Sequence, residues 1–409
     1  MRGIAALLVV LLHAGVPYMT RPLSHLVWPA IDGCPCPVID ALVWCIECFI
    51  MPLFFVLAGF LSAGLLALNG PRAFLEHRTK RLLWPQIAAT ITILPFCFYL
   101  WAWGWVADGL FAPRGFFIVG VPSELKAEMW GTAHLWFLEY LYIYCVVLWG
   151  ATLLRNRIQN FELASGQWRD RLRGRFDRMM LSPLKPLLPA IPCALILYRD
   201  PRIVLGFYQT FLPVASKLLY YAIYYFTGVF IHRQHRSLFL QARYGKRFLA
   251  AAAAVFALML PAIHQYQAAE LTGLSRAYLA VMLALFAWLA TYGLMGSFLL
   301  ARRGYNRVTK YLAEASYWVY LIHLPFVVLA QIALAPAPMP ALLKFAVSGA
   351  ATTSLALLTY QAFVRYTRVG EFLNGQQRRR PVGISTSAIL AMQSPPVIAS
   401  LNGDTLKAA

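Results

Sequence analysis

An arginine and a histidine, Arg2 and His13, flank an otherwise apolar run at the start of the chain. Eleven residues of α-helix make about three full turns and rise about 16 Å, so both side chains would lie on one face. Ionisable groups inside an apolar membrane segment are costly and are a functional hypothesis by default. The pair therefore predicts a site built through the membrane. The alternative is structural: an arginine that extends to the interface and a histidine that hydrogen-bonds between helices.

The second candidate is a basic turn over residues 76–85, in which Arg78 and Arg81 are three positions apart. Residues at this spacing project from one face of a helix. Two guanidinium groups on one face suit bidentate binding of phosphate or carboxylate, so the pair predicts a contact with an anionic cofactor such as coenzyme A. The alternative is a basic anchor that only fixes the orientation of the next apolar block.

A third cluster contains His134, Trp136 and Glu139 at the start of an apolar block. Glu139 falls well inside the block, so we expect it to be paired or uncharged, because an isolated buried charge is costly. Trp136 can serve simply as an interfacial anchor. Glu47 is a comparable acid in an earlier block, where it can cap or bridge helices.

The fourth candidate is the run 315–325, which places His323 mid-span and two residues before Pro325. Proline frees a backbone carbonyl of the preceding turn, and Tyr320 shares a face with His323 because it lies three residues earlier. A histidine packed and hydrogen-bonded between helices explains this stretch alone. Because no cysteine or histidine spacing is typical of a metal site, we expect no metal.

Membrane helices must position these residues. Hydrophobic residues make up 60% of the chain and charged residues only 13%, against about 25% charged in soluble domains. The apolar residues come in membrane-length blocks, and the first block lacks the cleavage site of a signal peptide. We predict an all-α polytopic membrane protein of about ten transmembrane helices, near residues 3–19, 39–68, 82–107, 134–154, 184–200, 211–231, 248–265, 274–300, 312–334 and 341–363.

The net charge of +20 is unequally shared between two sets of loops. Lysine and arginine gather in the loops after even-numbered spans and in the tail, and are sparse in the opposite loops. Because basic residues concentrate in cytoplasmic loops, this bias places both termini in the cytoplasm. We expect the basic clusters to fix the membrane topology and to contact anionic lipids, and we expect no nucleic-acid partner.

The chain divides into a membrane-embedded domain over residues 1–365 and a polar tail over 366–409, which we expect to be cytoplasmic and disordered. The fifth span, 184–200, is short and contains three prolines, so we expect it to be broken or tilted. Three segments are predicted outside the helical body: outward loops over 20–39 and 108–133, and an arginine-rich cytoplasmic segment over 156–182 that suits a surface-lying helix.

Taken together, the chain resembles the integral-membrane acyltransferase-3 family, especially its glucans-biosynthesis-C-like branch. Five motifs occur in family order over residues 1 to about 365: Arg2-x10-His13, Met51 to Phe60, Arg78-x-x-Arg81, His134 to Leu138, and Ser316-Tyr317 through His323-Leu324-Pro325. Each motif alone is weak evidence for the family, but five motifs in the family's order are specific evidence for it. Ile50 stands where the branch often has arginine, which leaves the acyl group and acceptor open. Members usually have several residues before the first arginine, which also leaves the true start open.

The resemblance implies a multi-pass O-acyltransferase of a bacterial inner membrane. It would move an acetyl or succinyl group from cytoplasmic acyl-CoA, its donor substrate, to a hydroxyl of an extracytoplasmic glycan or other carbohydrate, with no permanently bound cofactor. His13 would match the essential histidine, acting as general base or as a transient acyl carrier, and Arg78 and Arg81 would match the cofactor-binding pair. The other expected site residues are Arg2, Glu139 and His323 in catalytic roles, and His134, Trp136 and Tyr320 in substrate binding.

Two other classes remain open. A transporter or flippase of a small polar or glycan substrate would use the same buried polar groups without chemistry. Its usual sign is paired broken helices in two related halves, whereas only the fifth span is predicted to be broken. An acyltransferase-like sensor or scaffold that has lost catalysis is the second class, and the intact His13 favours the enzyme instead.

Overall fold

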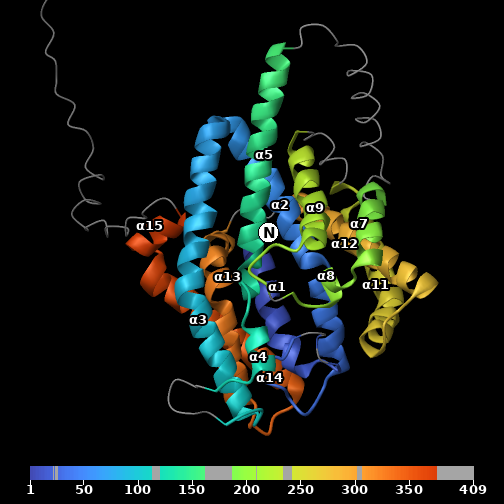
Figure 1. Cartoon of the computed structure of the whole chain (residues 1–409), viewed down its shortest axis with the longest axis vertical. Helices are drawn as coiled ribbons and strands as arrows, with labels where there is room; N and C mark the ends of the chain where they lie inside the picture. Colours follow the sequence, from blue (N-terminus) through green and yellow to red (C-terminus); the bar gives the residue numbers. More distant parts are fainter. Residues whose placement is uncertain are drawn as a thin grey trace, which may run out of the picture.

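The computed structural model describes residues 1–21, 23, 26–112, 120–161, 187–208, 210–233, 242–301 and 306–374. Within these ranges the named elements are all helical (Figure 1). In chain order they are α1 (Arg2–Gly15), η1 (Val16–Tyr18), α2 (Pro37–Arg78), η2 (Thr79–Leu83), α3 (Trp84–Ala107), α4 (Ser123–Glu128), η3 (Ala133–Leu135), α5 (Trp136–Phe161), α7 (Leu187–Arg199), α8 (Arg202–Leu205), α9 (Ala215–Arg233), α11 (Gly245–Ala268), α12 (Gly273–Leu300), α13 (Arg307–Leu334), α14 (Ala341–Thr359), η4 (Tyr360–Val364) and α15 (Arg368–Asn374).

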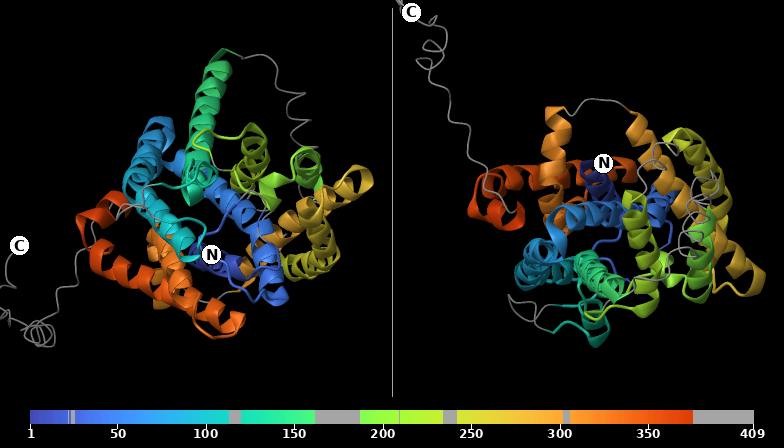
Figure 2. Two further views of the ribbon diagram at one scale, coloured as in Figure 1. Left: turned by 60° about the horizontal axis from the view of Figure 1, so that its bottom comes forward. Right: turned by 90° about the horizontal axis from the view of Figure 1, so that it is seen from above.

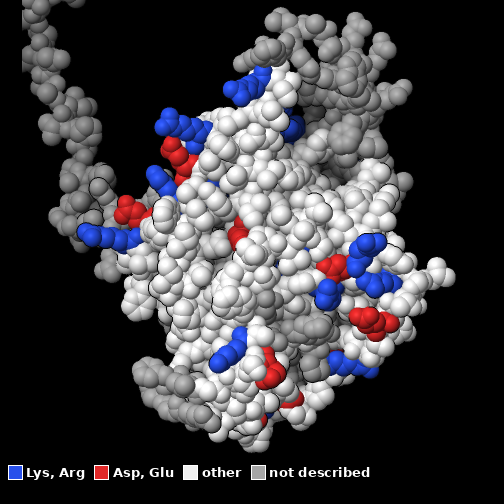
Figure 3. All heavy atoms as spheres, viewed as in Figure 1, with Lys and Arg blue, Asp and Glu red and all other residues white. Residues whose placement is uncertain are grey.

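Among the described residues, 6 helical runs are long and apolar enough to cross a membrane. The 71-residue run Pro37–Ala107 contains two of the predicted spans, whereas Arg2–Tyr18 and Leu188–Arg199 are apolar but shorter. Figure 3 shows a largely uncharged surface with scattered charged side chains. The chain is therefore an all-α, multi-pass membrane protein. The count of ten spans and the cytoplasmic location of both termini stay predictions.

Two boundaries differ from those expected. Helix α5 continues to Phe161 and projects beyond the rest of the bundle (Figures 1 and 2). The remainder of the arginine-rich segment lies outside the described residues. At the other end, α15 occupies the start of the expected tail, and Leu373 is buried. The Leu373 carbonyl oxygen accepts a hydrogen bond from Arg81, which ties α15 to η2. Residues 375–409 lie outside the described part.

Helix α1 is the central element, packed against α2, α13 and α14. Its glycines allow the close approach: a Cβ on Gly3 would lie 2.9 Å from the Leu312 backbone, and one on Gly15 would lie 2.5 Å from Val43. Small residues are common where membrane helices pack closely. In lipid the hydrophobic effect does not drive helices together, so close van der Waals packing contributes the attraction instead. The contacts fix the depth of α1, and therefore of His13, relative to its neighbours.

Helices α2 and α9 are in backbone contact. A Cβ on Gly59 would lie 1.9 Å from the carbonyl oxygen of Tyr225, and one on Gly228 would lie 2.0 Å from that of Val56. Each glycine therefore provides the space that the facing backbone occupies. This contact holds α2 at a fixed distance from α9.

Helix α2 bends sharply before its basic end. Gly70 has φ of 76°, which L-residues with a side chain rarely adopt, and Pro71 starts the next turn. Arg78 then ends the helix, and the single π-helical turn η2 carries Arg81 before α3 begins. Turns of this kind are frequent at functional sites because they displace side chains from the regular register.

The segment between η1 and α2 is tied down by buried polar contacts. Lys344 of α14 donates to the carboxylate of Asp32 over 2.6 Å, and both side chains are nearly enclosed. Asp40 is fully buried and lies 2.8 Å from His264 of α11. Because breaking one partner of a buried pair leaves an uncompensated charge, these contacts hold the segment against the bundle. Helix α7 begins at the first described residue after a gap and contains Pro192, and a broken or tilted fifth span stays a prediction.

Candidate active site

A cavity of about 630 Å³ runs between α1, α2, α5 and α13. Helix α2 contributes one face along its length, through Glu47, Met51, Phe54, Ala58 and Leu61. These positions recur every three or four residues, so they form one stripe, and the fourteen residues they span rise about 21 Å. The cavity therefore follows α2 for about two-thirds of a bilayer core.

Helix α1 forms the facing wall. Arg2 and His13 both line the cavity, together with Ala6, Val9 and Val16 between and beyond them. The one-face relationship that their spacing predicted is thus present in the structure. Arg2 belongs to the end of the cavity that carries Arg81, because the two guanidinium groups interact electrostatically. His13 lies about 16 Å further along the same wall.

His13 is held in a defined orientation. Its Nδ1 lies 2.8 Å from the carbonyl oxygen of Val9, one turn earlier in α1. A carbonyl can only accept, so Nδ1 donates, and in the neutral ring the lone pair is on Nε2. The backbone is held too, since Gln331 donates to the carbonyl oxygens of His13 and Ala14, and accepts from Trp28 over 2.9 Å.

Two further histidines surround His13. The ring of His323 lies 5.0 Å from that of His13 and 5.1 Å from that of His134. His323 donates through Nδ1 to the carbonyl of Tyr320, and His134 donates through Nε2 to that of Leu321. Each of these two rings keeps one buried nitrogen without a partner among the described residues. The structure therefore joins three histidines from α1, η3 and α13, although no metal-binding group exists in the described part of the chain.

Tyr320 connects the last two of these elements. Its hydroxyl donates to the carbonyl oxygen of His134 over 2.6 Å, which fixes η3 against α13. Tyr320 and His134 both line the cavity, whereas His323 is fully buried behind the lining residues. A residue in that position acts on the cavity through His13 and His134 rather than by direct contact.

The opposite end of the cavity is basic. Arg2, Arg78, Arg81, His77 and Lys310 line it. The Nε of Arg78 is buried and has no hydrogen-bond partner among the described residues, while its guanidinium carbon lies 5.6 Å from the ring of Phe74. Arg81 is positioned from both sides, since it donates to the Leu373 carbonyl and its own carbonyl accepts from Tyr317. Four of these five side chains are lysine or arginine, and Glu314 lines the cavity as well.

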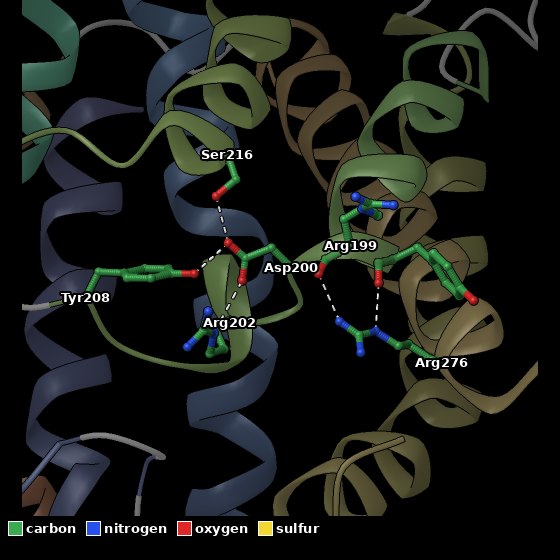
Figure 4. Close-up of polar contacts among 7 residues, drawn as sticks. Arg199, Asp200, Arg202, Tyr208, Ser216 and Arg276 are labelled. Atoms are coloured by element: carbon green, nitrogen blue, oxygen red, sulfur yellow. Dashed lines mark hydrogen bonds and ion pairs between the residues drawn. The ribbon is translucent and has the colours of Figure 1, made fainter. Parts of the chain in front are cut away.

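Val204 of α8 and, in the loop after it, Gly206 and Phe207 also line the cavity. Figure 4 shows how Asp200 anchors this loop: its Oδ2 accepts from Tyr208 over 2.5 Å and from Ser216 over 2.6 Å, and Arg202 lies 3.5 Å from Oδ1. Burial, together with the bond to Asp200, raises the pKa of Tyr208. Tyr208 therefore stays a hydrogen-bond donor throughout the physiological pH range.

A protein-family model described as an acyltransferase domain matches residues 1–361 of this chain. The chain belongs to the acyltransferase-3 family. The match covers nearly all of the described helices, and it confirms the family and the enzyme class expected from the motifs. Comparison with curated proteins and with solved structures found no match. Membership of the glucans-biosynthesis-C-like branch stays a prediction.

The acyltransferase brings most of the expected site residues to one cavity: Arg2, His13, Arg78, Arg81, His134, Trp136 and Tyr320. Glu139 is not among the lining residues. It is partly buried and interacts electrostatically with Lys217 of α9.

Lys217 and Glu47 are the residues that sequence reasoning undervalued. Lys217 is buried, with Nζ 3.5 Å from the ring centroid of Trp136, and it interacts with both Glu47 and Glu139. An ammonium over an indole ring in a desolvated site is a favourable contact. The sequence feature that could have identified Lys217 is its position inside an apolar stretch. Charged residues are rare in such stretches and are usually functional or paired.

Proposed function

We propose that this membrane acyltransferase takes its acyl group from a cytoplasmic acyl-CoA and transfers it to a hydroxyl of an extracytoplasmic glycan, in a bacterial inner membrane. The observation that carries the proposal is the continuous cavity, which has arginines at one end and His13 on the same wall about 16 Å away. A donor with a charged head and a long, uncharged arm ending in a thioester suits that shape and charge distribution.

The basic end would hold the donor's phosphates. Arg78 offers a buried N–H that no described residue accepts, and Arg2, Arg81 and Lys310 add positive charge around it. Charge-assisted bonds from guanidinium to phosphate are short and about twice as strong as neutral ones, and removing a bond to a charged group costs about 1.5–3 kcal/mol. The apolar middle of the cavity, lined by Phe54, Leu57 and Ala58, would enclose the uncharged arm.

His13 would act as general base. Its Nε2 takes the proton of the acceptor hydroxyl as the oxygen attacks the thioester carbonyl, and a tetrahedral intermediate forms. When the intermediate collapses, the carbon–sulfur bond breaks, the ester remains on the acceptor, and the imidazolium returns its proton to the leaving CoA thiolate. The bond from Nδ1 to Val9 keeps the ring in the tautomer that this reaction needs. His323 and His134 would hold the ring in place.

A donor labelled in two positions tests this proposal. Membranes from cells that produce the protein, and matched membranes without it, would receive acyl-CoA carrying ¹⁴C in the acyl group and ³H in the CoA part. The proposal predicts ¹⁴C without ³H in the carbohydrate fraction and release of an equal amount of free CoA thiol. A transporter would yield no ¹⁴C in carbohydrate above the membranes without protein, and that result would overturn the proposal.

Replacing Arg78 with alanine is expected to raise the donor KM roughly 10- to 100-fold, because a charge-assisted bond worth about 1.5–3 kcal/mol is lost. The turnover number should change little, since the reacting atoms are far away. Arg72→Ala is the matched control: Arg72 lies in the same helix, but it is solvent-exposed and pairs with Glu76 outside the cavity. Equal donor KM values for the two variants would rule out a donor-binding role for Arg78.

A further inference from the structure

Two segments of the chain lead from the cavity wall to an exposed pair of aromatic rings. Ala133 and His134 line the cavity, and Trp130, three residues before Ala133, is 70% exposed. Phe207 also lines the cavity, and Phe211, four residues later, is 38% exposed. The rings of Trp130 and Phe211 meet edge to face, with 5.3 Å between their centroids. Because Trp130 is only four residues from His134, the pair belongs to the end of the cavity that carries the histidines.

The exposed pair is held in place by buried polar contacts beneath it. Asp200 accepts hydrogen bonds from Tyr208 over 2.5 Å and from Ser216 over 2.6 Å, so it fixes the chain on both sides of Phe211 (Figure 4). The fixed phenylalanine supports one edge of the Trp130 indole. A surface that is ordered before a ligand arrives loses less conformational freedom on binding. The flat face of the indole is therefore a preorganised surface.

Trp130 differs from a tryptophan that anchors a helix in the lipid interface. Trp103 fits the anchoring role: it lies near the end of the long helix α3, it is 46% exposed, and it does not line the described cavity. Trp130 instead lies between the short helices α4 and η3, and its ring contacts a second loop segment. Exposed aromatic side chains next to a cavity are typical of ligand-binding sites.

We infer from this arrangement that Trp130, supported by Phe211, binds the acceptor carbohydrate by stacking on one of its sugar rings. The inference rests on the proposed function and names the place where its acceptor binds. One face of a sugar ring carries C–H groups, whose partial positive charge is attracted to the negative face of an indole. Stacking also removes apolar surface of both rings from water. A glycan of several sugars can hold one ring on Trp130 while a neighbouring ring extends toward His13.

The test measures the acceptor KM of purified full-length protein. Wild type, Trp130→Ala, Trp130→Phe and Trp103→Ala would receive saturating ¹⁴C-acetyl-CoA or ¹⁴C-succinyl-CoA and increasing amounts of the carbohydrate fraction from cells without the protein. We expect Trp130→Ala to raise the acceptor KM about 10-fold or more, with the turnover number and the donor KM unchanged, because the stacked surface is lost. Trp130→Phe keeps a flat ring, so its acceptor KM should stay within about 3-fold of the wild-type value.

Trp103→Ala is the matched control, because it removes an exposed indole that does not line the described cavity, and it should keep the wild-type acceptor KM. A wild-type acceptor KM in Trp130→Ala would overturn the inference. So would an equal rise in Trp103→Ala, or a rise in the donor KM of Trp130→Ala as large as that in its acceptor KM. Failure of the proposed function gives a different result, namely no transfer by wild type at any acceptor concentration, and the inference would fall with it.

Discussion

Replacing His13 with glutamine is expected to lower the rate of acyl transfer by about 10²- to 10⁴-fold, the contribution typical of a positioned general base. Glutamine can still donate a hydrogen bond to the Val9 carbonyl, so α1 and its packing should be preserved. It offers no basic nitrogen, so the hydroxyl proton has no acceptor. The donor KM should stay at the wild-type value, because the arginines are untouched. Steady-state kinetics on purified protein measure both constants.

His323→Gln provides the comparison within the same cluster. His323 does not line the cavity and would act only by holding His13 and His134, with ring separations of 5.0 and 5.1 Å. Its variant should therefore lose less activity than His13→Gln. A His13→Gln protein that keeps the wild-type turnover number would contradict the assignment of His13 as base. A His323→Gln protein with the larger loss would move that assignment to His323.

Replacing Gly59 with alanine is expected to prevent correct packing of α2 against α9. The added Cβ would lie 1.9 Å from the carbonyl oxygen of Tyr225 and 3.1 Å from the nitrogen of Val229. Overpacking costs typically about 1–3 kcal/mol, and a clash this close with the α9 backbone should reach at least the upper end of that range. The helices would have to separate, and Glu47 and Lys217 would separate with them. The yield of monodisperse protein and its unfolding temperature in detergent report the loss.

Gly150→Ala is the control for the glycine substitution itself. Gly150 lies in α5, and a Cβ there would have nothing within 4 Å. Alanine favours a helix by about 1 kcal/mol over glycine, so this variant should be at least as stable as wild type. If Gly59→Ala matched Gly150→Ala in yield and unfolding temperature, the close approach of α2 and α9 in the structure would be wrong.

Sequence reasoning succeeded where the physics is local. The rise and repeat of an α-helix are enough to place Arg2 and His13 on one wall, and both line the cavity. The same reasoning recognises a run of apolar blocks as an all-α membrane protein. Each of these conclusions depends on residues within a few helical turns of one another.

The spacing of residues within one helix did not predict the contacts between helices that are distant in sequence. His134 bonds to the carbonyl of Leu321, 187 positions away, and no local pattern encodes that pairing. Tyr320 and His323 are three residues apart, yet one lines the cavity and the other is buried behind it. Such relationships depend on helix contacts such as Gly15 on Val43.

The most direct test of the account uses sealed inside-out vesicles, in which the cytoplasmic face is outside. Doubly labelled acyl-CoA is added outside, and label on carbohydrate inside the vesicles is counted for wild type and His13→Gln. The account predicts that the acyl label alone reaches carbohydrate inside wild-type vesicles, that the CoA label stays outside, and that His13→Gln reduces the transfer at least 100-fold. Equal acyl label inside both sets of vesicles, or CoA label inside either, would contradict it.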